Sequence, residues 1–227
     1  MKKLRFLLPA LAGFFAVSIA SATSLNDVQF WAGSGTNRAG LVLDWNDGKS
    51  AESLLWGYRW NGTASGLDML HAIVEADPRL FANVGVFSFG TAVLGIGYDL
   101  NNDGVFDVSP SLTFDSGGWS VGTPDDSRGP TDLADHWLEG WNSGFWGYNL
   151  RDSADAAWVA AFFGPSDRTL SDGVWDGYSF APGFNFTDPS EPAIAPVPEP
   201  TTLGLFGASG LVLLGRWIRK SRATSAK

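Results

Sequence analysis

The residues with the most informative chemical spacing form one short acidic loop, Asp-Leu-Asn-Asn-Asp-Gly-Val-Phe-Asp, at residues 99–107. Oxygen-bearing side chains stand at its first, third, fifth and ninth positions, a glycine at the sixth allows a sharp bend, and the seventh offers a backbone carbonyl. Ca²⁺ takes about six to eight oxygen ligands, so this spacing predicts a calcium site. Its ligands would be Asp99, Asn101, Asp103, Val105 and Asp107.

The same loop departs from an EF-hand at its twelfth position. Pro110 stands there in place of the bidentate carboxylate, which excludes a helix–loop–helix calcium sensor. Apolar stretches flank the loop on both sides and favour a calcium loop between two strands. The alternative is an Asn-Asp-Gly hairpin turn that binds no ion.

Aromatic side chains are concentrated in the second half of the chain. Exposed rings beside Asp, Asn and Glu stack well on sugar rings, which predicts a glycan-binding face. Its candidate residues are Trp137, Trp141, Trp146 and Trp175. The alternative is that most of these rings belong to the core, since a domain without disulfides needs large buried side chains.

Signals for catalysis are weak. The chain has two histidines and no G-x-S-x-G, P-loop or H-E-x-x-H motif. Glu139 with Asp135 or Asp176 would make a glycosidase-type carboxylate pair. Carboxylates are so frequent in this chain that some pair always looks suitable. We therefore expect a protein that is not an enzyme, with a glycan-acting hydrolase as the alternative.

Composition and charge narrow the class of protein. The 227 residues include no cysteine, 11 Trp and 16 Phe, so one domain can be held by core packing without disulfides or thiolate metal sites. Between the two ends lie all 24 acidic residues and only seven of the 15 Lys and Arg residues. So acidic a surface repels polyanions, which excludes nucleic acid as a partner.

Residues 1–22 have the three regions of a secretory signal peptide. Lys2, Lys3 and Arg5 are followed by an apolar stretch at 6–19, and Ala20 and Ala22 form an A-x-A cleavage site. We therefore expect secretion machinery as a partner and a mature chain beginning at Thr23.

The other end of the chain has the pattern of a transmembrane helix followed by a basic tail. Residues 187–200 are rich in proline and predict an extended linker. Residues 201–218 are apolar and, as a helix, reach about 27 Å, just enough to span the inner membrane. The basic tail at 219–227 should stay in the cytoplasm, so the domain is held outside.

This ending resembles the PEP-CTERM sorting signal of Gram-negative bacteria. The resemblance is carried by Pro198, Glu199 and Pro200, the apolar segment 202–214, and a basic cluster that includes Arg216 and Arg219. It implies recognition of the Pro-Glu-Pro motif by a membrane exosortase, followed by release or transfer to the cell surface. It also implies a host that makes exopolysaccharide or biofilm.

The middle of the chain predicts a mainly β domain over residues 23–186. Alternating or β-branched stretches predict strands at 51–60, on both sides of Gly90 within 83–99, and at 111–114, 145–150, 157–163 and 178–180. Residues 65–76 predict one amphipathic helix, because Ser65 and Asp68 form a capping box and Pro78 ends the run. Many short strands with one helix favour an antiparallel β-sandwich.

These patterns together predict an exported protein of the cell envelope or extracellular matrix. It would be a non-enzymatic structural or glycan-binding module stabilised by calcium, with exopolysaccharide as a candidate partner. The alternative is a secreted glycan-acting hydrolase that uses a carboxylate pair.

Overall fold

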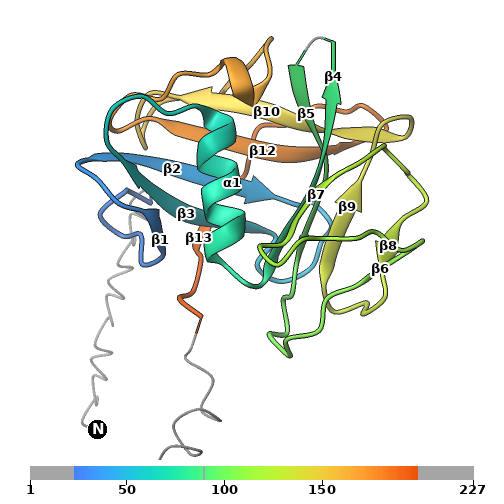
Figure 1. Cartoon of the computed structure of the whole chain (residues 1–227). Coiled ribbons are helices and arrows are strands. Elements are labelled where there is room, and N and C mark those ends of the chain that lie inside the picture. Colours follow the sequence, from blue (N-terminus) through green and yellow to red (C-terminus); the bar gives the residue numbers. More distant parts are fainter. Residues whose placement is uncertain (1–22, 89, 199–227) are drawn as a thin grey trace, which may run out of the picture.

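The computed structural model describes residues 23–88 and 90–198, which form a mainly β domain with a single α-helix (Figure 1). The predicted signal peptide, membrane helix and basic tail lie outside the described residues. So do six individual predicted positions, Ala20, Ala22, Glu199, Pro200, Arg216 and Arg219. Within the described residues, no helix has both the length and the apolar character needed to cross a membrane.

The largest sheet has seven strands and is mixed. In spatial order they are β1 (Trp31–Gly33), β3 (Ser53–Trp60), β2 (Asn37–Asp44), β12 (Trp175–Pro182), β10 (Gly144–Arg151) and β11 (Val159–Ala160), and β13 (Ala193–Ile194) also pairs with β3. The β2–β3 and β10–β12 pairs are antiparallel, whereas β12 runs parallel to β2 at the centre. Strands far apart in the sequence therefore form the middle of the sheet.

A second sheet of four strands lies beside the first in Figure 1. Its order is β7 (Trp119–Val121), β4 (Leu80–Phe87), β5 (Gly90–Tyr98) and β9 (His136–Glu139). A short pair, β6 (Val108–Ser109) with β8 (Gly129–Pro130), lies in the chain between β5 and β9. The acidic loop thus begins directly after β5, a strand of this second sheet.

Helix α1 (Gly66–Ala76) follows the predicted capping box. The Ser65 side chain accepts the N–H of Asp68, and the Asp68 carboxylate accepts the N–H of Ser65. Met69, Leu70 and Ile73 are buried on the face toward the sheets, and a 3₁₀ turn, η1 (Pro165–Asp167), also contacts the helix. The predicted helix is confirmed, and its inner face joins the core.

Both large sheets share one core. Trp45 and Trp56 are fully buried at its centre, with ring centroids 6.5 Å apart in an edge-on contact. The Trp45 indole donates to the carbonyl of Ile96 on β5, which ties the first sheet to the second. Large aromatic side chains thus fill the space between the sheets, as expected for a chain without disulfides.

Several sequence-based strand predictions are confirmed and others are wrong. The strands at 51–60, 83–99, 145–150 and 178–180 are present. Residues 111–114 form no strand, and 157–163 contains only β11. The antiparallel sandwich is not confirmed, because β1 and β13 run parallel to β3, β12 to β2 and β7 to β4. Parallel partners come from distant segments, and local alternation does not reveal them.

The predicted linker is also corrected, because part of it belongs to the fold. Residues 189–198 lie against the large sheet instead of leading away from it, and β13 pairs with β3. Pro189, Pro192 and Ala195 are buried, at every third position. One side of this segment therefore faces the domain.

The buried ion pair of Asp77 and Arg79 gives the first prediction. Asp77 also accepts the Trp56 indole N–H at 3.0 Å. Arg79→Met leaves that carboxylate buried without its cation, so the free energy of unfolding should fall by about 3–5 kcal/mol. Arg59→Met is the control, because the guanidinium of Arg59 lies 4.4 Å from the Trp31 ring centroid and its loss removes about 0.5–1 kcal/mol.

Urea unfolding followed by tryptophan fluorescence measures both variants. Equal losses of stability for Arg79→Met and Arg59→Met would contradict the claim that the buried Asp77–Arg79 ion pair stabilises the fold more than the Arg59–Trp31 contact.

Candidate functional site

The acidic loop begins where β5 ends and is curled by its own side chains. Asp99 is buried, and its two carboxylate oxygens accept the backbone N–H groups of Asp103 and Gly104 at 3.2 and 2.9 Å. Asn101 accepts the N–H of Asp103, and Asp103 accepts that of Val105, at 3.0 and 2.8 Å. Gly104 has φ +80°, the left-handed conformation that glycine adopts without steric cost.

One of the five predicted calcium ligands, Asp107, has other partners. Its carboxylate accepts the N–H of the next residue, Val108, at 2.8 Å, and its backbone carbonyl accepts the N–H of Thr131. Val105 is predicted to bind through its backbone carbonyl, and that part stays a prediction. The structure therefore brings Asp99, Asn101 and Asp103 together, while Asp107 joins the loop to the segment before β9.

Two further carboxylates stand beside this loop, and the calcium pattern in the sequence did not include them. The Asn101 amide donates to Asp132 at 2.9 Å, and the N–H of Leu100 donates to Asp135 at 3.1 Å. Asp135 is buried, and among the described residues its second oxygen has no hydrogen-bond partner. Burial, together with the charges of Asp99, Asp132 and Asp103, raises the pKa of Asp135 to about 6.

The fit to a metal is incomplete. Within residues 23–88 and 90–198, no group of three or more His, Asp or Glu side chains is arranged to hold a metal ion. The free oxygen of Asp135 and the carboxylates around Asn101 are nevertheless groups that a cation would satisfy. Calcium at this loop therefore stays a prediction.

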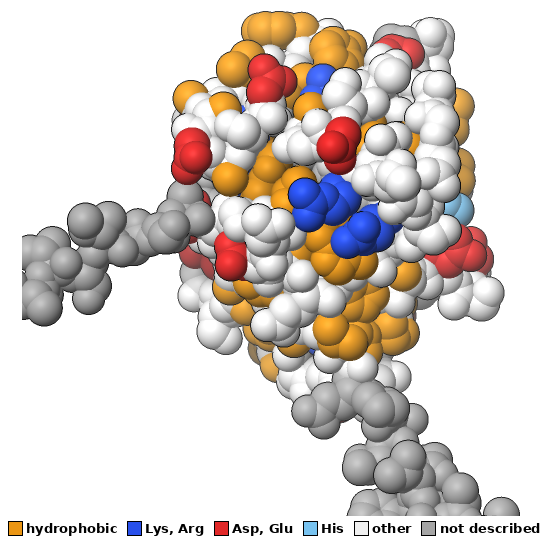
Figure 2. All heavy atoms as spheres, turned by 90° about the vertical axis from the view of Figure 1, so that its left-hand side faces the viewer, with side chains coloured by type: hydrophobic (Ala, Val, Ile, Leu, Met, Phe, Trp, Pro, Cys, Tyr) orange, Lys and Arg blue, Asp and Glu red, His pale blue; other side chains and the backbone are white. Residues whose placement is uncertain are grey.

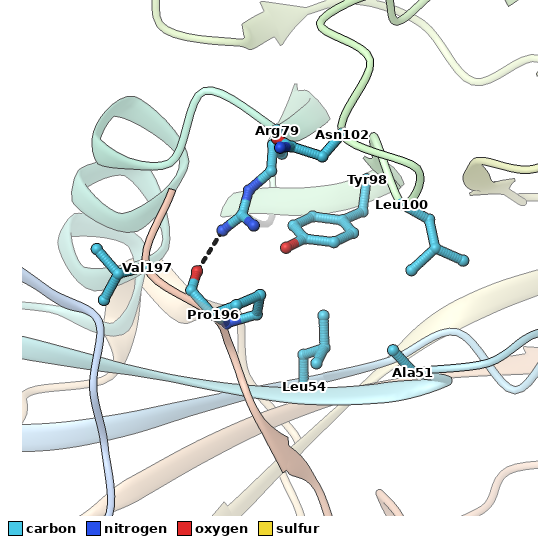
Figure 3. Close-up of a pocket in the computed structure, with 8 residues that line it drawn as sticks. All are labelled: Ala51, Leu54, Arg79, Tyr98, Leu100, Asn102, Pro196 and Val197. Carbon is cyan, nitrogen blue, oxygen red and sulfur yellow. Dashed lines mark hydrogen bonds between the residues drawn. The ribbon is translucent and has the colours of Figure 1, made fainter. Parts of the chain in front are cut away.

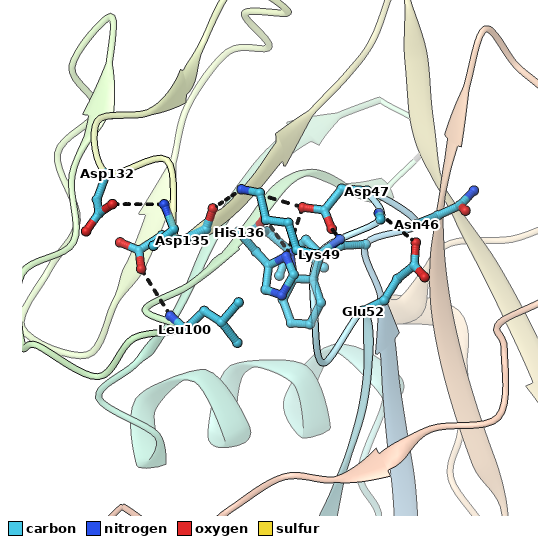
Figure 4. A network of polar contacts seen from close by, with 12 residues as sticks. Asn46, Asp47, Lys49, Glu52, Leu100, Asp132, Asp135 and His136 are labelled. Carbon is cyan, nitrogen blue, oxygen red and sulfur yellow. Dashed lines mark hydrogen bonds and ion pairs between the residues drawn. The ribbon is translucent and has the colours of Figure 1, made fainter.

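A polar network anchors the loop after β2 to the start of β9, next to Asp135 (Figure 4). The buried ring of His136 contacts the Asp47 carboxylate at 2.9 Å and stacks on Trp45 with centroids 4.5 Å apart. The Lys49 ammonium group donates to the backbone carbonyl of Asp135. Two connecting loops are thereby held in place around the buried carboxylate.

An aromatic cleft of about 400 Å³ lies on the opposite end of β5 from the acidic loop. Its walls come from β5, the β9–β10 turn, β10, the segment between β11 and η1, and β12. The lining includes Thr91, Trp141, Trp146, Tyr148, Phe162 and Tyr178. Trp141 is 39% exposed and Phe162 is 97% exposed, whereas the hydroxyl of Tyr178 is buried and has no hydrogen-bond partner within the part of the chain that the structure describes.

The four tryptophans predicted as a glycan-binding face do not share one surface. Trp141 and Trp146 line the cleft together. Trp137 is buried against Phe106 and Phe114, with ring centroids 6.1 and 5.8 Å away. Trp175 is buried under the guanidinium of Arg151, at 4.2 Å. Two of the four are therefore candidates for ligand contact, and Tyr178 lines the cleft with them.

The predicted catalytic carboxylates have separate sets of partners. Glu139 is buried and accepts from Arg128 at 2.8 Å and from Asn83 at 3.0 Å, yet burial still raises its pKa. Asp176 accepts the Tyr148 hydroxyl at 2.5 Å and lies near Arg168, and burial raises its pKa to about 6. Asp135 belongs to the acidic loop.

The chain leading to the predicted sorting motif is fastened to the domain by backbone contacts. The Ser190 N–H donates to the Asp44 carboxylate at 2.7 Å, and the Ala195 N–H donates to the Leu55 carbonyl at 3.0 Å. Figure 3 shows the next contact, in which the Arg79 guanidinium donates to the Pro196 carbonyl beside a cavity of about 290 Å³.

Comparison with known proteins bears on this C-terminal end. Residues 196–220 match the family model described as the PEP-CTERM protein-sorting motif. No curated protein and no solved structure matches the chain. The match includes the Pro-Glu-Pro motif, the apolar segment and the Arg-rich ending identified in the sequence. The chain therefore carries a PEP-CTERM sorting signal at its C-terminus, which implies an exported protein that is processed at the membrane by exosortase.

Proposed function

We propose that the exported domain is a non-enzymatic module of the cell envelope or extracellular matrix that binds a neutral glycan. The observation that carries this proposal is the cleft in which Trp141, Trp146 and Tyr178 meet. Its volume of about 400 Å³ lies in the usual range of small-ligand sites, roughly 300–1,000 Å³.

The chemistry of the cleft suits a sugar ring. A pyranose has apolar C–H faces that stack on aromatic rings and hydroxyls that need hydrogen-bond partners. Trp141 offers a partly exposed ring at the mouth, and Tyr178 offers a buried hydroxyl that has no partner inside the domain. Burying such a group unpaired costs about 1–3 kcal/mol, which a ligand hydroxyl would recover.

The charge of the domain decides which glycans fit. Acidic residues far outnumber basic ones in the exported part of the chain, so an anionic polysaccharide would be repelled. We therefore expect neutral hexose oligosaccharides as ligands. The C-terminal sorting signal supports an exported domain, which an extracellular glycan could reach.

Calcium is the second part of the proposal. Asp99, Asp103, Asp132 and Asp135 would hold the ion only after moving together, because these carboxylates are not arranged as a metal-binding group in this structure. Asn101 would add a neutral oxygen ligand after rotation of its amide. The ion would neutralise carboxylates that otherwise repel one another and would stiffen the connection from β5 to β6.

A glycan-acting hydrolase is the second candidate. Asp176 favours it, because this carboxylate has a raised pKa and contacts Tyr148, which lines the cleft. A general acid needs a raised pKa. A hydrolase also needs a second carboxylate, and Glu139 is poorly suited to that role because Arg128 and Asn83 already donate to one of its oxygens.

For glycan binding, Tyr178→Phe removes only the unpartnered hydroxyl, so it should weaken binding at least about tenfold while the melting temperature is kept or raised. Trp141→Ala should abolish stacking at the mouth. Tyr58→Phe is the matched control, since Tyr58 stacks on Trp60 in the core at a centroid distance of 5.4 Å.

A glycan array identifies the ligand, and isothermal titration with that oligosaccharide measures the three variants. Binding that is equal in Tyr178→Phe and Tyr58→Phe would rule out the cleft. If the protein cleaves the bound oligosaccharide and Asp176→Asn stops the cleavage, the hydrolase is the correct function and the non-enzymatic binding module is wrong.

For calcium, the ion should raise the melting temperature of the protein. At a concentration of 100 times Kd it adds about 2.7 kcal/mol, which corresponds to roughly 5–10 °C for a domain of this size. Asp103→Ala and Asp135→Asn should each remove the gain, whereas Asp155→Ala, an exposed carboxylate in the loop after β10, should keep it. Identical melting curves with calcium and with chelator would contradict the site.

A further inference from the structure

Residues 189–198, which we call the strap, join the folded domain to the sorting motif. Their buried positions are Pro189, Pro192 and Ala195, and the half-buried Pro198 continues the same period of three. Pro198 is also the first residue of the Pro-Glu-Pro motif. The docked face of the strap therefore ends next to the sorting motif.

The strap completes the outer edge of β3. Strand β1 covers the part of this edge at Gly57–Arg59, and β13 covers Leu54 and Leu55, both in parallel register. Ala195 is fully buried in the main core. An uncovered edge strand exposes unpaired backbone groups, so the domain gains from keeping the strap in place.

The last anchored atom lies very close to the motif. Arg79 donates to the Pro196 carbonyl at 2.5 Å, and the guanidinium is itself fixed by its buried ion pair with Asp77. Figure 3 shows the strap passing over β3 at this point, with Tyr98 and Leu54 lining the cavity beside it. Only Val197 separates the anchored residue from Pro198.

The family model of the sorting motif begins at residue 196, so the segment that is processed overlaps the strap. Enzymes and peptide-binding domains hold a chain segment in extended form through its backbone groups and its side chains. Here the backbone of Ala195 and Pro196 is engaged by the domain, and Pro198 is partly covered.

We propose that the folded domain competes with exosortase for the strap, so that the motif is processed from molecules in which the strap has left β3. The released state is within reach, because β13 has only two residues and most strap side chains are small or exposed. The apparent affinity of the enzyme for its substrate then falls in proportion to the released fraction. The docking of the strap against the domain therefore sets the rate of sorting. This inference rests on the sorting signal and not on glycan binding.

A matched pair of substitutions in the strap tests the competition. Ala195→Asp places a charge at a fully buried position and should release the strap, whereas Ala193→Asp places the same charge at an exposed position of β13. In a host that processes the full-length protein, pulse–chase labelling should show precursor conversion at least about threefold faster for Ala195→Asp, with Ala193→Asp unchanged. Near-ultraviolet circular dichroism checks that the core is kept.

Two insertions repeat the test without touching the core. A Gly-Gly-Ser-Gly insert between Val197 and Pro198 moves the motif away from the docked strap and should speed conversion in the same way. The same insert between Thr187 and Asp188 lengthens the chain upstream of the strap and should leave the rate unchanged. A variant with alanine at residues 198, 199 and 200 marks the unprocessed level.

Equal conversion rates for the two insertions would overturn the proposal, whatever the folding of Ala195→Asp. A slower rate with the insert before Pro198 would overturn it as well, because it would show that the docked strap presents the motif to the enzyme.

Discussion

One buried carboxylate, Asp77, connects helix α1 with a strand of each large sheet. It ends helix α1, accepts the indole N–H of Trp56 on β3 and pairs with Arg79 at the start of β4 through two hydrogen bonds. A charge removed from water is stable only when it is paired and hydrogen-bonded on all sides, so these neighbours have little freedom to move apart. Arg79 extends the same constraint to Pro196, so the sorting end of the chain is attached to the centre of the core.

Strand β5 places the two candidate sites at its opposite ends. Thr91 near its start lines the aromatic cleft, and Asp99 directly after its end opens the acidic loop. Between them Ile96 accepts the indole N–H of Trp45 and so fixes the strand against the large sheet. A rigid strand with a functional group at each end suits a module that is held by an ion on one side and binds a ligand on the other.

The acidic surface and the sorting signal point to the same environment. A domain with this excess of carboxylates repels polyanions, and Asp and Glu side chains are spread over the face that Figure 2 shows. Its exposed rings are concentrated near the cleft and at the turn after β12, where Phe184 and Phe186 stand. The strap links the folding of the domain to the processing of the sorting signal. Ala195, on the inner face of the strap, is part of the core. The equilibrium between docked and released strap therefore affects both the stability of the domain and the accessibility of the motif.

The sequence by itself determined the features that depend on neighbouring residues: the capping box of α1, the hairpin around Gly90, the curl of the acidic loop and the tripartite sorting signal. Only the tertiary structure decided which strands pair in parallel, that Asp132 and Asp135 join the acidic loop, that Trp137 and Trp175 are buried, and that the proline-rich segment docks as β13. Local hydrogen bonds and periodicity depend on residues that are close together in the sequence. Contacts between distant segments depend on how the sheets close on each other, and no short stretch of sequence encodes that closure.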